Sequence, residues 1–324
     1  MPTEPTQPSG PPDEKGLNAE ELDHLLTRVQ DGVVSRRQLV QLGGRDHDIA
    51  RLLRRRDLVA AHPGVYVNHN GPLTAEQRAW VAVLACWPAS LCSRSALPKP
   101  STSDLVHVAV GHRRSVRAPA WVVVHRMSDF EERTNWMRSP PRVRLEHVAI
   151  DEALSQVSVA GRFRVLADVC QTRETTAKAI IEALATRRRV CGRQELVELL
   201  RDLDTGACSV LERGYLDLER RHGLPEADRQ RAERLAGRLI YRDAPYVELG
   251  LKVELDGGAF HDNAAARERD ADRDLDTLVD DDSATVRLTY GQVFDRGCLT
   301  IAKIATLLER RGWPGPFVRC PNCC

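Results

Sequence analysis

Leucines at helical spacing mark the first ordered stretch of the chain. Leu17, Leu22, Leu25 and Leu26 recur at the intervals of one helix face. The residues before them are rich in Pro, Thr, Ser and Glu and carry almost no apolar side chains. Such a segment cannot bury enough surface to offset the entropy lost on ordering, so we predict a disordered tail over residues 1–17.

The next helix is indicated by its end signals. Ser35 is followed three residues later by Gln38, which is the spacing of a capping box. Gly43 and Gly44 then end that helix, and Asp46 can cap the one that follows. Two short helices around a glycine turn predict a helix-turn-helix.

The helix after the glycine turn leads into a hairpin. Ile49, Leu52 and Leu53 form its inner stripe, and the stretch LVAAHPGVYVNH reads as two short strands around a Pro-Gly turn. Helix, glycine turn, helix and hairpin together predict a winged helix-turn-helix over residues 18–98.

Five arginines lie in or beside the second helix of this turn: Arg45, Arg51, Arg54, Arg55 and Arg56. In such modules this helix enters the major groove of DNA, so we expect these side chains to contact DNA. Two alternatives stay open, because arginines are common on solvated helix faces and winged helices also serve as protein-docking modules.

The stretch VVSRRQLVQLGGRDHDIARLLRRRDLVAAHPGVYV resembles the N-terminal winged helix of the AbiEi-type antitoxin family. The resemblance covers roughly residues 20–97. It implies DNA binding and autoregulation of a type IV toxin–antitoxin operon, with a toxin encoded nearby as a partner.

The middle of the chain, residues 99–200, mixes strand and helix patterns. A buried helix, EQRAWVAVLACW, precedes it, and DLVHVAV and AWVVVHRM predict two strands. A helical stretch follows from Phe163 to Leu184. The histidines here are too dispersed to indicate a metal site, and we derive no chemistry from this segment.

The pattern changes again after residue 201. An amphipathic helix begins at Ser209 and ends at Gly223, two strands follow over 237–250 and in LKVELDG, and a further helix, strand and helix close the segment. We expect an α/β (mixed α+β) protein made of five segments: 1–17, 18–98, 99–200, 201–313 and 314–324.

The strand LKVELDG places two acids on one face. Side chains alternate along a strand, so Val253 and Leu255 face one way and Glu254 and Asp256 the other. Two neighbouring carboxylates repel each other, and a hard divalent cation compensates for them. Glu-x-Asp is also common on a solvated strand face, which is the simpler interpretation.

A metal site needs further ligands. Asp243 on the preceding strand and Glu212 on the helix before it can join Glu254 and Asp256 around Mg²⁺, or Mn²⁺. Such an ion polarises a phosphate and lowers the pKa of a bound water. His261 follows two glycines and is a candidate general base or phosphate donor.

These residues resemble the DUF559 group of the PD-(D/E)xK nuclease superfamily, which is related to very-short-patch-repair endonucleases. The likeness covers about residues 205–313. It implies a mixed sheet flanked by helices and metal-dependent cleavage of DNA. Asp256 stands where the superfamily usually has a lysine, and Lys252 or Arg287 is the candidate replacement.

Two functions therefore stay open. One is a DNA-binding, metal-dependent endonuclease. The other is an antitoxin-like transcriptional regulator whose nuclease-like domain is catalytically inactive. Either can act as a homodimer.

Charge and hydropathy bear on the cellular location of the protein and on where it could bind nucleic acid. The formal net charge of +1 means that nucleic-acid affinity must come from local patches. No apolar run approaches the ~20 residues of a membrane span, and the N-terminus lacks the features of a signal peptide. We expect a cytoplasmic protein with no membrane partner.

The C-terminal sequence RCPNCC contains half of a zinc site. Cys320 and Cys323 have the Cys-x-x-Cys spacing of zinc ligands, but no second pair and no paired histidine lie nearby in the sequence. A zinc ion would need ligands from elsewhere in the chain or from a second subunit. The sequence by itself favours a tail without structural zinc.

Overall fold

The fold is given by a computed structural model, which describes residues 16–98, 104–205, 209–227, 231–235, 238–242, 244–256, 284–321 and 323. The chain divides into two compact units, Met1–Val148 and Ala149–Cys324. Both contain helices and strands, which confirms the mixed α/β class. The boundaries expected near residues 98 and 200 fall inside these units.

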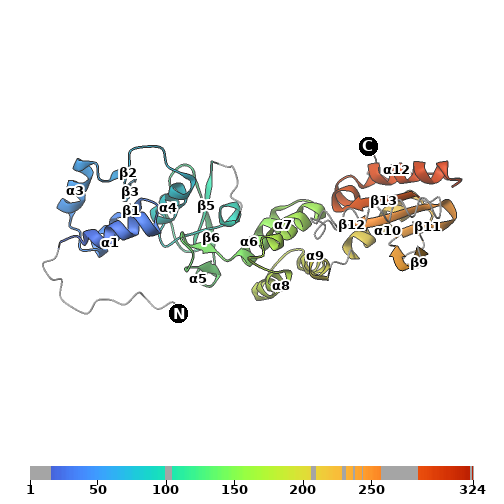
Figure 1. The fold of residues 1–324 in the computed structure, drawn as a ribbon, viewed down its shortest axis with the longest axis horizontal. Coiled ribbons are helices and arrows are strands. Elements are labelled where there is room, and N and C mark those ends of the chain that lie inside the picture. Colours follow the sequence, from blue (N-terminus) through green and yellow to red (C-terminus); the bar gives the residue numbers. More distant parts are fainter. Residues whose placement is uncertain are drawn as a thin grey trace. The chain divides into compact units, whose positions relative to one another are not determined.

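Unit 1 opens with a small helical and strand module. Its elements are α1 (Ala19–His24), η1 (Leu25–Val29), β1 (Val33–Ser35), α2 (Arg36–Gln41), α3 (Asp46–Arg55), β2 (Val59–His62) and β3 (Val65–Val67). The strands form an antiparallel sheet in the order β1-β3-β2. This is the topology of a winged helix-turn-helix, as the sequence predicts (Figure 1).

The predicted end signals of α2 are present. The Ser35 hydroxyl accepts a hydrogen bond from the Gln38 backbone N–H, and the Gln38 side chain accepts one from the Ser35 N–H. Gly43 adopts a φ of +85°, a conformation that glycine reaches without strain. The tight turn into α3 depends on this residue.

The predicted cap of α3 is wrong. Asp46 is the first residue of the helix, and its carboxylate lies 2.5 Å from Arg36 of α2. Asp48 instead accepts a hydrogen bond from the Arg45 N–H at 3.1 Å. An acid at the third helical position reaches back to the first free N–H, whereas Asp46 is drawn away by an arginine.

The rest of unit 1 forms a second sheet. Its elements are α4 (Ala75–Ala85), β4 (Ser90–Leu91), η2 (Ser93–Ala96), β5 (Val106–Gly111), β6 (Val122–Met127), α5 (Phe130–Arg133), β7 (Thr134–Asn135) and β8 (Arg142–Val143). The five strands follow the order β6-β5-β4-β8-β7, with β5 and β6 parallel.

Helix α4 lies between the two sheets of unit 1 (Figure 1). Trp80 and Leu84 pack in the core of the winged helix, while Ala82 and Val83 pack against the five-stranded sheet. All four are buried. The buried helix predicted from EQRAWVAVLACW is confirmed, and its apolar character on every side follows from having two partners.

Unit 2 begins with helices. Helix α6 (Leu145–Ser155) spans the boundary, and it is followed by α7 (Val159–Gln171), α8 (Ala177–Thr186) and α9 (Arg193–Thr205). The helical stretch expected from Phe163 to Leu184 is interrupted. Arg173 adopts a φ of +61°, and Thr176 caps α8 by accepting a hydrogen bond from the Ala179 N–H.

The remainder of unit 2 is a small sheet with helices. Its elements are α10 (Ser209–His222), β9 (Arg231–Leu235), β10 (Arg238–Arg242), β11 (Ala244–Tyr246), η3 (Val247–Leu249), β12 (Leu251–Asp256), β13 (Ala284–Thr289), η4 (Gly291–Asp295) and α12 (Gly297–Arg310). Figure 1 shows α12 running alongside this sheet.

The strands of unit 2 differ in detail from the prediction. The single strand expected over 237–250 is divided into β10, β11 and η3, and β9 pairs with β10 in a separate hairpin. Strand β12 is antiparallel to β11 and parallel to β13, so the sheet is mixed, as expected. The helix predicted over 262–281 lies outside the described residues.

Helix α10 presents its predicted apolar stripe. Leu211, Tyr215 and Leu218 are all buried. Gly214 lies where α10 meets η4, and a Cβ atom there would lie 2.5 Å from the Phe294 ring. The glycine therefore permits the close approach of the two segments. Within the described part of the chain, no helix is both long and apolar enough to cross a membrane.

Candidate functional site

The predicted DNA contacts lie on the surface of unit 1. All five arginines are exposed: Arg45, Arg51, Arg54, Arg55 and Arg56. They lie in or directly beside α3, whose opposite face packs Ile49, Leu52 and Leu53 into the core. The amphipathic pattern read from the sequence is confirmed, and it leaves the arginines free of core packing.

Acidic neighbours modify this positive surface. Arg51 lies 2.9 Å from Asp48, and Arg55 lies 3.9 Å from Asp57. The Arg45 N–H lowers the pKa of the Asp48 carboxyl, which is therefore anionic at neutral pH. Among the described residues, none forms an ion pair with Arg54, which follows Arg51 by three positions on the exposed face.

Strand β12 alternates as predicted. Val253 and Leu255 are buried, whereas Glu254 and Asp256 are half-buried on the other face. The Glu254 carboxylate lies 3.2 Å from Arg287 Nε on β13. Arg287, one of the two residues proposed to replace the missing lysine, therefore contacts one of the paired acids.

The other predicted ligands are only partly described. Glu212 is half-buried on α10. Asp243 and His261 lie outside the described residues, although Ala244, next to Asp243, pairs with Val253. Glu254 and Asp256 lie on β12 and Glu212 lies on α10, and the position of Asp243 between them is not described. The magnesium site stays a prediction.

A buried polar chain connects α10 to β11, and sequence reasoning missed it. The Tyr246 hydroxyl donates a hydrogen bond to Glu219 at 2.5 Å and lies 2.8 Å from the Tyr215 hydroxyl. Glu219 is fully buried. Burial raises the pKa of Tyr246, and its two neighbours raise it further. Tyr246 is therefore a neutral donor to a buried acid.

Four metal-binding side chains meet elsewhere in unit 2. His222 is the last residue of α10, Cys298 lies in the first turn of α12, and Cys320 and Cys323 belong to the C-terminal segment. One ligand atom from each lies within 4.8 Å of the other three. We call these residues the Cys/His group.

The Cys/His group supplies what the Cys-x-x-Cys motif lacks in sequence. The absence of nearby ligands argued against zinc, but folding brings His222 beside Cys323 from 101 positions away. No local signal links these residues. A search for Cys and His residues at predicted helix ends would have identified candidates without selecting among them.

Comparison with known proteins gives no family assignment. The chain matches no protein-family model and no curated protein.

Proposed function

We propose that the protein binds duplex DNA through its winged helix, with α3 in the major groove. The observation that carries this proposal is the topology α1–β1–α2–α3–β2–β3 together with the exposed arginines of α3. Positive charge attracts the phosphate backbone whatever the base sequence.

The exposed face of α3 suits close approach to a groove. His47, Ala50, Arg51 and Arg54 are exposed and recur at intervals of three or four residues along this helix. Ala50 keeps the centre of the face small, while Arg51 and Arg54 extend beyond it. Arginine forms bidentate hydrogen bonds to guanine in the major groove, so this face can read sequence as well as charge.

Selection of bound sites from random duplex DNA by the full chain tests the proposal directly. Arg51→Ala/Arg54→Ala removes two charges from α3, and Lys178→Ala/Arg201→Ala removes two exposed charges from unit 2. We expect the first variant to bind at least tenfold more weakly and the second to bind as well as the unmodified chain. Equal binding by all three proteins would refute the role of α3.

A second candidate function is metal-dependent cleavage of DNA by unit 2. The mixed β11-β12-β13 sheet favours it, because β12 carries Glu254 and Asp256 on one face beside Arg287. Asp243 and Glu212 would complete a Mg²⁺ or Mn²⁺ site in this hypothesis. A bound ion of this type polarises a phosphodiester.

The endonuclease hypothesis and the antitoxin-like regulator hypothesis predict different results in DNA cleavage and binding assays. Incubation of the full chain with Mg²⁺ or Mn²⁺ and duplex, nicked or mismatched DNA should release cut strands, and Glu254→Gln should abolish them. Specific binding to its own promoter without cleavage under any of these conditions would instead favour the antitoxin-like regulator. A co-purifying toxin would support that second role.

A further inference from the structure

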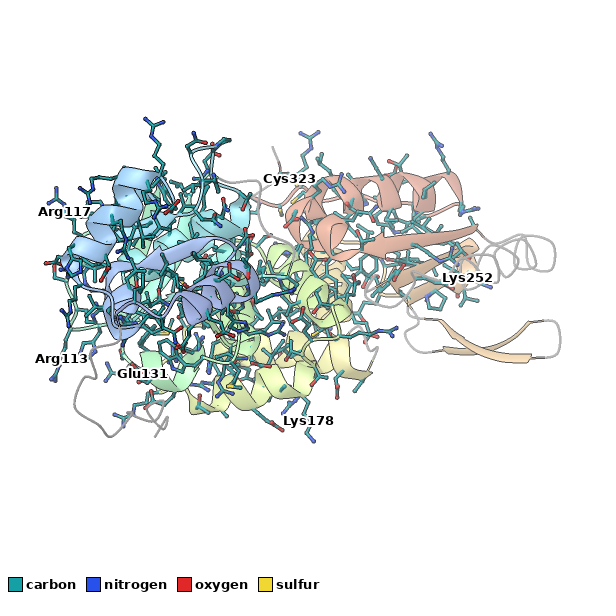
Figure 2. All side chains as sticks on the ribbon, turned by 60° about the vertical axis from the view of Figure 1, so that its left-hand side comes forward. Arg113, Arg117, Glu131, Lys178, Lys252 and Cys323 are labelled. Carbon is teal, nitrogen blue, oxygen red and sulfur yellow. The ribbon has the colours of Figure 1, made fainter. Side chains whose placement is uncertain are left out.

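We infer that His222, Cys298, Cys320 and Cys323 together bind one zinc ion. This Cys/His group is separate from the acids of β12. Figure 2 labels Cys323 and Lys252, and the two lie well apart within unit 2, with Lys252 on β12. The inference does not depend on DNA binding or on cleavage.

The sulfur atoms have the spacing of a tetrahedral metal site. The Cys298 and Cys320 Sγ atoms lie 3.6 Å apart, and those of Cys320 and Cys323 lie 3.8 Å apart. Four ligands at the Zn–S distance of about 2.3 Å place sulfurs about 3.8 Å from each other. A disulfide would bring them to about 2.05 Å, so none of these pairs is oxidised.

The histidine is held for metal binding. His222 is fully buried, and its ring stacks on Phe317 with centroids 5.1 Å apart. Nδ1 lies 2.8 Å from the Val318 carbonyl oxygen and 3.9 Å from the Cys323 Sγ atom. Nδ1 therefore lies beside both a carbonyl oxygen and a thiol, and the tautomer of the ring decides which nitrogen offers a lone pair to a metal.

The other ring nitrogen of His222 has no hydrogen-bond partner in the described part of the chain. His222 Nε2 is buried without a hydrogen bond among the described residues. A buried polar atom in this state costs free energy unless another group satisfies it. A metal ion bound through Nε2 would satisfy this atom, whereas a metal ion bound through Nδ1 would replace the contact of that nitrogen with Val318.

The ligand chemistry selects zinc over hard cations. Three thiolates and one imidazole are soft or borderline ligands, and four of them close a tetrahedron. Such a site has no open position for substrate, so its role is structural. It would join the end of α10, the start of α12 and the C-terminal segment.

The position of the site explains how the C-terminal segment is attached. Residues 313–320 have no helix or strand, yet the Val318 N–H donates a hydrogen bond to the His222 carbonyl at 2.9 Å. Zinc would add two bonds, through Cys320 and Cys323, to this contact. The same ion would fix α10, which carries Glu212.

Metal analysis of the full chain, purified without chelator, tests the inference. We expect about one zinc per chain, as in structural Cys₃His sites. Cys298→Ser and His222→Ala should lose most of it, His222→Cys should retain it, and Cys191→Ser, which changes an exposed cysteine, should leave it unchanged. Replacement by Co²⁺ should give the visible absorption of a tetrahedral thiolate site.

Alkylation of the unmodified chain avoids variants that fail to fold. Cys298, Cys320 and Cys323 should resist the reagent until a chelator removes the metal, whereas Cys191 should react in both states. The inference is overturned if the folded chain contains no zinc and takes up no Co²⁺. It is also overturned if Cys191→Ser lowers zinc as much as Cys298→Ser, or if two of the three cysteines are isolated as a disulfide.

Discussion

Arg287 on β13 lies directly across from Glu254 on β12, with 3.2 Å between Arg287 Nε and Glu254 Oε2. Glu254 and Asp256 share one face of β12, so their carboxylates repel each other unless a positive charge lies nearby. Arg287 on the neighbouring strand supplies a compensating positive charge beside Glu254. The pair is partly buried, so solvent screens it less than a surface ion pair.

We expect Glu254 and Arg287 to be energetically coupled. A double-mutant cycle with Glu254→Gln and Arg287→Ala should give a coupling of about 1 kcal/mol or more, as for contacting charged residues. The exposed pair Arg220–Glu226 is the matched control and should give about 0.5 kcal/mol or less. Urea denaturation of the single and double variants measures both values. Equal coupling in the two cycles would contradict the prediction.

The buried hydrogen bonds among Tyr215, Tyr246 and Glu219 predict which of two tyrosine variants is less stable. Tyr246→Phe removes one hydrogen-bond donor to buried Glu219 and should cost about 2–3 kcal/mol of unfolding free energy. Tyr215→Phe leaves that hydrogen bond in place and should cost less. Chemical denaturation at pH 7 compares them, and the reverse order would contradict the larger contribution of the Tyr246–Glu219 hydrogen bond.

The same tyrosine predicts a loss of stability at alkaline pH. Burial raises the pKa of Tyr246 above that of an unfolded tyrosine, which is about 10. The folded state therefore keeps its proton where the unfolded state loses it, so this contribution is complete below about pH 10 and declines above it. The unfolding free energy should fall more steeply between pH 9.5 and about 11 in the unmodified chain than in Tyr246→Phe. If the unfolding free energies of the two proteins fall in parallel with pH, the loss of stability is due to groups other than Tyr246.

Arg114 should stabilise unit 1 rather than bind a partner. Its guanidinium donates hydrogen bonds to the carbonyls of Cys86 and Trp87 at 2.9 and 2.8 Å, and to that of Pro88, just after the end of α4. These carbonyls have no further helical turn to bond, so a cation there is favourable.

Replacing Arg114 should lower the stability of unit 1, whereas replacing Arg113 should not. Arg114→Ala should lower the unfolding free energy of unit 1 by about 2–3 kcal/mol, and Arg114→Lys should restore only part of it. Arg113 is exposed and labelled in Figure 2, and Arg113→Ala is the control. Thermal unfolding followed by tryptophan fluorescence reports on both, since Trp80 and Trp87 lie in this unit. Equal losses would refute the capping role.

Salt dependence should separate phosphate contacts from structural arginines. If Arg54 contacts a phosphate, Arg54→Ala should lower the slope of log affinity against log salt by about 1. Arg133→Ala should leave the slope unchanged, because this arginine pairs with Asp129 at 2.8 Å on the other part of unit 1. Fluorescence anisotropy with a fixed duplex over several salt concentrations gives both slopes. An unchanged slope for Arg54→Ala would place this residue away from the backbone.

Local sequence signals predicted local structure well. The Ser35–Gln38 capping box, the stripe of α10 and the alternation of Val253 and Leu255 each depend on neighbours within a few positions. Such interactions can be read directly from spacing. The prediction was weaker for Asp46, because the arginine that draws it away is on another helix.

The Cys/His group and the Tyr246–Glu219 contact could not be predicted in the same way. Their members are brought together by the packing of α10, α12, β11 and the C-terminal segment, and sequence spacing contains no record of that packing. A Cys-x-x-Cys indicates half of a ligand set, but it does not say which distant residues complete it. Asp243 and His261 remain predictions, as does the metal site they would share with Glu254.

Because α4 packs against both sheets of unit 1, the winged helix cannot be separated from the rest of that unit without exposing apolar side chains. A fragment that ends near residue 98 would keep Trp80 covered but would expose Ala82, Val83 and Cys86 to water. Such a patch promotes aggregation. Grafting the winged helix onto another protein would therefore require residues 16–148 together, and evolution by exchange of modules would face the same requirement.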